Sequence, residues 1–198
     1  AVDARAAPDT DPAAATRLQA RARTVDVVGR LWLQGFSDVH LDAGGVDGGE
    51  LRLSAVNPQS PGDPTQREGL LAFDGTLRLD ASRTFATTAS LFTVNGVEAS
   101  RLLLGTGPGG AATSAPLSVF GELLLQAGTI DHRGVLWQPF GALTLQAREH
   151  LQLRDGSLTS VSGAGVARLY GSTVNLSTWQ LPSQGRLGTD QPRTLPAA

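Results

Sequence analysis

The sequence predicts an all-β protein, a parallel β-helix (β-solenoid) of roughly eight coils, on three observations. First, the heptad Gly-x-Leu-x-Leu-x-Ala occurs four times without error. Second, the leucines of these heptads alternate with mostly polar residues, and this period of two is typical of a strand with one buried face. Third, the 24 glycines and 11 prolines interrupt the chain too often for long helices.

The four exact heptads begin at Gly49, Gly75, Gly121 and Gly141, and looser copies follow the same alternation at Val39–Ala43 and Val174–Ser177. A period of roughly 20 to 25 residues with a short strand in each period indicates a solenoid. One apolar row cannot be buried by a single strand, so we expect equivalent strands of successive coils to stack about 4.8 Å apart. This stacking predicts that Leu145, in the last exact heptad, lies inside the core.

Along the chain, the pattern divides the sequence into three parts. Residues 1–15 are poorly patterned, and residues 180–198 are expected to form an irregular tail. The β-helix repeats are expected over 16–179, beginning with a strand that contains Leu18 and Ala20. Two stretches interrupt the repeats, a proline-rich one at 57–67 and a Gly/Ala/Thr/Pro stretch at 105–116, and both are expected to be loops.

The composition excludes several classes of protein. The chain of 198 residues has no Cys, which excludes a disulfide scaffold and a Cys-based zinc site. Its net charge of −2 gives no excess of basic charge to bind nucleic acid. No run of 18 apolar residues exists, so no membrane-spanning helix is expected. The start at Ala1 has neither an initiator Met nor the pattern of a signal peptide, so we expect an internal piece of a longer protein.

Three stretches resemble a known family. The run Leu143–Ser157, which reads LTLQAREHLQLRDGS, is similar to coils of filamentous haemagglutinin-like exoproteins, the large secreted partners of bacterial two-partner secretion. The stretches Gly134–Gly141 and Gly156–Gly163, followed by Tyr170–Thr173, resemble a segment that recurs in very long members of that family. The resemblance extends over roughly Leu18 to Trp179.

The resemblance implies a right-handed β-helix and a secreted or cell-surface adhesin. The family's secretion-signal domain lies at the N-terminus of the parent protein and is not recognisable here, so this piece would belong to the shaft. The implied partners are flanking repeats of the parent chain, an outer-membrane transporter during export, and a host-surface protein or glycan. The absence of Cys is consistent with export of an unfolded chain.

Asp131-His132-Arg133 is the densest ionisable cluster in the sequence. One interpretation is the acid/base site of a β-helical polysaccharide lyase or hydrolase. Sugar hydrolysis needs a second carboxylate within about 5 to 9.5 Å, and Asp155 is the only candidate. The alternative interpretation is a solvated turn between Ile130 and Val135.

Other polar candidates have simpler explanations. Asp42–Gly49 faintly resembles a glycine-rich calcium repeat, but it is a single imperfect copy and is expected to be a turn. The three histidines, His40, His132 and His150, are far apart in sequence, with His40 and His150 at outward positions. Ser160 and Ser162 lack the Gly-x-Ser-x-Gly elbow of a serine hydrolase. No metal site and no cofactor are predicted.

Among the three tryptophans, Trp32 is the best candidate for a contact surface. It lies between Leu31 and Leu33, so alternation places it on the face opposite those leucines. Trp137 and Trp179 are expected to pack at coil corners, although all three tryptophans together would suit a strip that stacks on sugar rings. The sequence therefore predicts a non-enzymatic shaft segment. A β-helical carbohydrate-active enzyme and a carbohydrate-binding module remain the alternatives.

Overall fold

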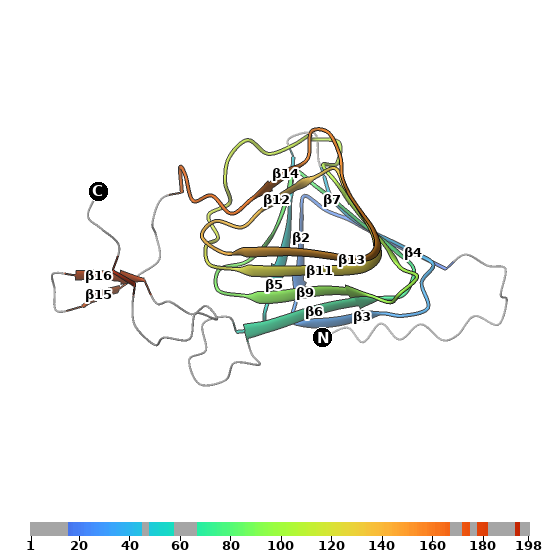
Figure 1. Cartoon of the computed structure of the whole chain (residues 1–198), viewed down its shortest axis with the longest axis horizontal. Helices are drawn as coiled ribbons and strands as arrows, with labels where there is room; N and C mark the ends of the chain where they lie inside the picture. The colour runs from blue at the N-terminus through green and yellow to red at the C-terminus, as the bar shows by residue number, and fades with distance from the viewer. Residues whose placement is uncertain are drawn as a thin grey trace.

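The computed structural model describes residues 16–44, 48–57 and 67–166. It also describes the backbone of three short strands, β15 (Ser172–Val174), β16 (Thr178–Leu181) and β17 (Arg193–Thr194). Within this described part the protein is all-β and has no α-helix. Parallel strands curl around a common core (Figure 1), which is compatible with a β-solenoid and confirms the all-β fold class.

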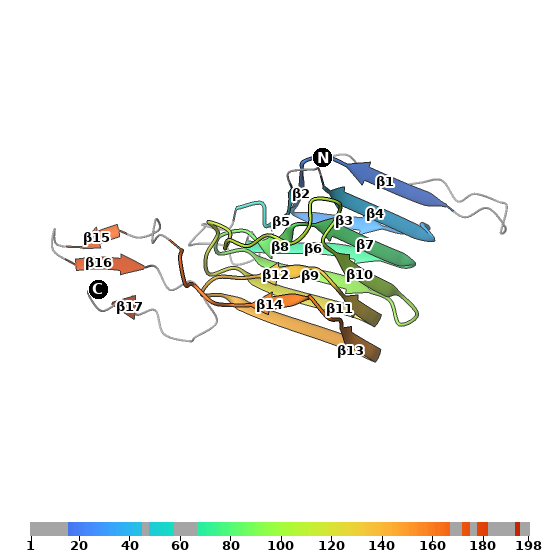
Figure 2. The same cartoon turned by 90° about the horizontal axis from the view of Figure 1, so that it is seen from above.

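Strands three apart in chain order usually pair in parallel, and this pairing produces three ladders. The first ladder contains β1 (Arg17–Arg21), β4 (Asp38–Ala43), β7 (Thr76–Ala81), β10 (Arg101–Gly105) and the second halves of β11 (Glu122–His132) and β13 (Ala142–Leu153). The second contains β2 (Thr24–Val28), β5 (Glu50–Ser54), β8 (Arg83–Ala86), β12 (Val135–Trp137) and β14 (Leu158–Ser160). The third contains β3 (Arg30–Leu33), β6 (Glu68–Phe73), β9 (Leu91–Gly96) and the first halves of β11 and β13. Figure 2 shows the first ladder as successive steps.

The core consists of columns of apolar side chains that follow the register of the ladders. In the third ladder one column runs through Leu31, Leu71, Val94, Leu125 and Leu145. The middle members Leu71, Val94 and Leu125 are fully buried, because a rung lies on each side of them. Leu145 packs against the core but is only partly buried, since β13 is the last rung of this ladder.

The four exact heptads do not all stack on one another. The heptad at Gly49 supplies β5 of the second ladder, and the heptad at Gly75 supplies β7 of the first. Only those at Gly121 and Gly141 are stacked neighbours, with Leu123 opposite Leu143 in the third ladder. The heptad therefore specifies a strand with one buried face and does not specify a particular ladder.

The described residues hold fewer rungs than the eight coils expected for the whole chain. The first ladder, the longest, has six, from β1 to β13. Loops lengthen the coils, so that equivalent positions in this ladder lie between 21 and 38 residues apart. At about 4.8 Å per rung, the six rungs span about 24 Å.

A tight corner joins the two halves of β11 at Gly128. A Cβ atom at this position would lie 2.0 Å from the backbone oxygen of Glu98, closer than real Cβ atoms approach, so only glycine fits. The register between β11 and β13 shifts at the same place, between Ala127 and Thr129. The bend allows one long strand to contribute to the first and the third ladders.

Residues 106–121 bypass the second ladder. Between β10 and β11 the chain contributes no strand to this ladder, and β12 pairs with β8 through a single register position, Leu136 opposite Thr84. The side chain of Gln138 completes the contact, since its amide donates to the oxygen of Ala86 at 2.8 Å and accepts from the Ala86 N–H at 2.9 Å. Gln138 is fully buried and so replaces a backbone pairing partner.

Outside the three ladders, β15 pairs with β16 and β16 with β17, in both cases antiparallel. Residues 1–15 and most of 57–67 and 180–198 lie outside the described residues, so the expectations for them stay predictions. The described part of the chain has no helix with the length and apolar character needed to cross a membrane.

Candidate functional site

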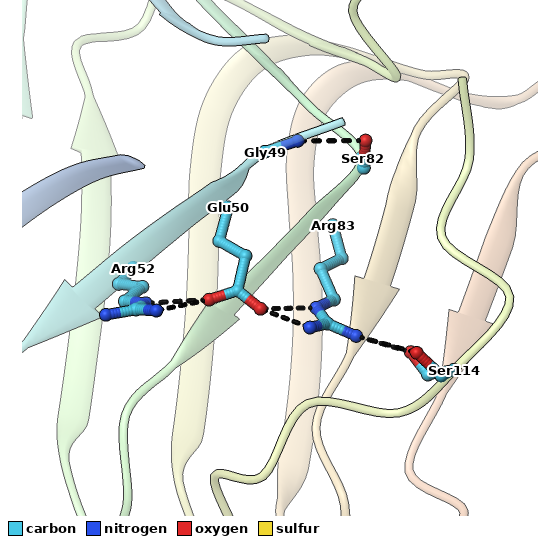
Figure 3. Close-up of polar contacts among 6 residues, drawn as sticks. All are labelled: Gly49, Glu50, Arg52, Ser82, Arg83 and Ser114. Carbon is cyan, nitrogen blue, oxygen red and sulfur yellow. Dashed lines mark hydrogen bonds and ion pairs between the residues drawn. The ribbon is translucent and has the colours of Figure 1, made fainter. Parts of the chain in front are cut away.

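A cavity lies beside residues 106–121, the segment that contributes no strand to the second ladder, and an ionic network (Figure 3) forms part of the cavity wall. The Glu50 carboxylate lies between two guanidinium groups. Arg52 donates from Nε and Nη2 to Oε2 at 2.8 and 2.6 Å. Arg83 donates from Nε to Oε1 at 2.8 Å and also from Nη2 to the same oxygen. Arg83 Nη1 reaches the backbone oxygen of Ser114 at 2.7 Å.

Strand geometry explains why these side chains meet. Glu50 and Arg83 are register partners on β5 and β8. Arg52 lies two residues after Glu50 on β5, so both side chains project from the same outer face. Burial raises the pKa of Glu50, but the hydrogen bonds and charges of Arg83 and Arg52 outweigh this effect, and the pKa is lowered. Glu50 is therefore held as the carboxylate.

The cavity has a volume of about 470 Å³. It is lined by the ionic network, by the corner residues before β2, β5 and β8, and by the returning loop: Arg23, Thr24, Gly48, Gly49, Glu50, Arg52, Ser82, Arg83, Gly109, Ala111, Ala112, Thr113 and Ser114. The loop is fixed to the corner because the Ala112 N–H donates to the Ser82 oxygen at 2.8 Å. The corner itself is held by Gly49, whose N–H donates to Ser82 Oγ at 3.2 Å.

Asp131 lies on the outer face of the first ladder, next to a second cavity of about 270 Å³. Arg154 donates to its carboxylate at 2.8 Å and Arg133 at 3.2 Å. These hydrogen bonds, first that of Arg154 and then that of Arg133, lower the pKa of Asp131 to about 2. Such a group is ionised at neutral pH and cannot serve as a general acid there. The register partner of Asp131 on the next rung is the neutral Gln152, and Asp155 is not among the residues that line this cavity.

His132 is not part of a solvated turn, so that interpretation is wrong for this residue. Its position in the register is an inward one, opposite Leu104 and Leu153, and its side chain is fully buried. Nε2 lies 3.1 Å from Thr159 Oγ1. Burial lowers the pKa of His132, so the ring is neutral at pH 7. The inward position of His132 follows from strand alternation, because His132 lies two residues after the apolar Ile130.

The remaining polar candidates do not form a metal centre. His40 Nε2 lies 2.8 Å from Asp80 on the next rung, and Arg21 donates to Asp42 at 2.8 Å. His150 is exposed and distant in register from His40. In the glycine-rich stretch from Asp42, residues 45–47 lie outside the described part. Across the described ranges no group of three or more His, Asp or Glu side chains is arranged to hold a metal ion.

The tryptophans do not share one environment. Trp32 on β3 is 50% exposed, on the face opposite Leu31 and Leu33. Trp137 is partly buried on β12 and donates from Nε1 to the Ser162 oxygen at 2.9 Å. Trp32 and Trp137 lie on different ladders and do not form a strip. The side chain of Trp179 lies outside the described residues.

Sequence reasoning missed the Glu50 network. The pair Glu50 and Arg52 stands inside an exact heptad, and its two-residue spacing already places both on one outer face. Arg83 lies 33 residues from Glu50, so its contribution depends on the strand register. Ser114 depends further on the path of the loop.

No protein-family model, curated protein or solved structure matches the chain.

Proposed function

We propose that this chain is a shaft segment of a secreted, filamentous haemagglutinin-like exoprotein, built as a right-handed parallel β-helix. The observation that carries the proposal is the in-register stacking of parallel strands in three ladders around aliphatic columns, interrupted only in the second ladder between β8 and β12. Right-handed crossovers account for about 98% of connections between parallel strands of one sheet. The sequence resemblance described above supports the choice of family.

The shaft acts through its stiffness. Each rung adds backbone hydrogen bonds to the rung before it and buries its inward leucines, each of which contributes about 1.5 to 3 kcal/mol. On the last described rung Leu145 is partly exposed and Leu153 is 60% exposed, and a further rung stacked on β13 would cover both. Stacked coils then hold a distal binding or effector region away from the cell.

In this proposal the parent is exported through an outer-membrane two-partner secretion transporter and stays at the bacterial surface or is released. The chain has no Cys, so no disulfide obstructs an unfolded chain during transport. The flanking repeats are its permanent partners. Contact with a host-surface protein or glycan belongs to the exposed side chains, of which Trp32 is the first to test.

A replacement experiment in the parent gene tests the shaft role. One strain lacks the codons for residues 16–166, and a second carries an unrelated parallel β-helix with the same number of rungs in their place. We expect adhesion to fall in the first strain and to recover in the second, at equal amounts of parent protein on the cell surface. If the replacement strain reaches the same surface amount but does not adhere, a stiff spacer of the right length is not sufficient, and the proposal that this segment acts through its stiffness is wrong.

A further inference from the structure

The cavity beside the Glu50 network has a surplus of positive charge. Among the described residues, three arginines and one glutamate line it, and no other acidic or basic side chain of that part of the chain does. Glu50 is already shared between Arg52 and Arg83, so its single negative charge is neutralised within the wall. Arg23 is exposed and makes no side-chain hydrogen bond or ion pair with the described residues. The cavity is therefore suited to an anion, and Arg23 is the group free to bind it.

Hydroxyl groups give the same cavity a second chemical character. Thr24, Ser82, Thr113 and Ser114 line it, and no aromatic side chain of the described ranges does. The hydroxyls of Ser82 and Ser114 accept hydrogen bonds from Gly49 and Arg83, which leaves each O–H proton available to a ligand. Such a lining favours a small molecule with several hydroxyl groups over a flat apolar one.

The size of the cavity fits the same class of ligand. Its volume of about 470 Å³ is within the range of small-molecule sites, about 300 to 1,000 Å³. A bare oxyanion could accept hydrogen bonds from these hydroxyls, but it would leave most of that space empty. A sugar ring with one carboxylate matches both features, because the guanidinium group of arginine recognises planar carboxylates.

We propose that this cavity binds an acidic sugar, with its carboxylate on Arg23 and its hydroxyls on the Thr24, Ser82, Thr113 and Ser114 side. The Glu50 network is the positioning element, since it fixes Arg83 and, through Ser114, the loop that closes the cavity. This binding site is additional to the shaft role and does not depend on it.

The test uses the purified chain and two methyl glycosides of the same ring, methyl α-galacturonoside and neutral methyl α-galactoside. Nuclear magnetic resonance of backbone amides and arginine Nε–H groups follows the titration. We expect saturable shifts at Gly49, Ser82 and Ser114 with the uronate and none with the neutral sugar. Equal binding of the two sugars, or shifts elsewhere only, would overturn the proposal. Inorganic phosphate is the third probe, and binding as tight as that of the uronate would show an anion site without sugar recognition.

Arg23→Gln is the variant for this site, because Arg23 is exposed and its loss leaves no described group without a partner. Loss of one charge-assisted hydrogen bond weakens uronate binding by about tenfold or more. Arg17→Gln is the matched control, since Arg17 is also exposed and does not line the cavity. Arg23→Lys, which keeps the charge, is expected to restore part of the affinity. Unchanged affinity in Arg23→Gln contradicts the proposal.

Discussion

Replacing Gln138 by alanine is the most direct test of whether its side chain takes the place of the strand that is absent between β8 and β12 in the second ladder. Gln138 is fully buried, and its amide makes two hydrogen bonds, to the N–H and the oxygen of Ala86. Gln138→Ala leaves both backbone groups buried without a partner. Each such group costs about 1 to 3 kcal/mol, so we expect the free energy of unfolding to fall by about 2 to 6 kcal/mol. That is a large part of the roughly 5 to 15 kcal/mol of an ordinary domain.

The assay is urea denaturation at pH 7, followed by far-ultraviolet circular dichroism. The midpoint should fall while the dependence on urea concentration stays the same, because the surface exposed on unfolding is nearly unchanged. Gln19→Ala is the control, since Gln19 is exposed on β1 and a change there is expected to stay within about 0.5 kcal/mol. A loss of less than about 1 kcal/mol in Gln138→Ala would refute the idea that this amide replaces a strand.

Gln138→Glu separates the two hydrogen bonds. The carboxylate keeps the shape and accepts from the Ala86 N–H, but it has no proton to donate to the Ala86 oxygen. Burial raises the pKa of such a carboxyl, so this variant should recover stability relative to the wild type as the pH falls and the group becomes protonated. A difference from the wild type that does not change with pH would contradict this account.

Three further predictions concern the core and the ionic groups. Leu125→Ala should lower the free energy of unfolding by about 2 to 5 kcal/mol and Leu145→Ala clearly less, because a rung covers Leu125 on both sides and Leu145 on one only. Equal losses of the two variants in urea denaturation would contradict the order of these residues in the column. The pKa of His132 is lowered on folding, so the unfolded chain binds the extra proton and stability should fall as the pH drops below about 6.5. His132→Leu should make the melting temperature less dependent on pH below about 6.5. An unchanged dependence would mean that His132 is not the group responsible. Asp131→Asn should lower the free energy of unfolding by less than about 1 kcal/mol, because its partner Arg154 lies at the surface. A larger loss in thermal denaturation would show that the ion pairs of Asp131 stabilise the fold.

Much of the core was predictable because the side-chain period of a strand is two. Alternation alone places Leu51, Leu53, Leu77 and Leu79 on inward faces, and all four are fully buried. The same rule gives the outward position of Trp32, which is half exposed. Applied consistently, it would also have placed His132 inside, two residues after Ile130. The ionisable neighbours Asp131 and Arg133 favoured a solvated turn and obscured that signal.

The sequence by itself determined the all-β class and the inward rows, since these depend on residues that are close together in the chain. Only the tertiary structure decided which strands stack, why the heptads fall in three ladders, and how Glu50 meets Arg83. The physical reason is that a period of two specifies the face of the sheet on which a residue lies, but not the strand with which it pairs. A longer loop between two strands adds little to the entropic cost of pairing them. Coils of 21 to 38 residues are therefore all compatible with the same local pattern. The register, and with it the cavity at Arg23, is fixed only when the rungs pack together.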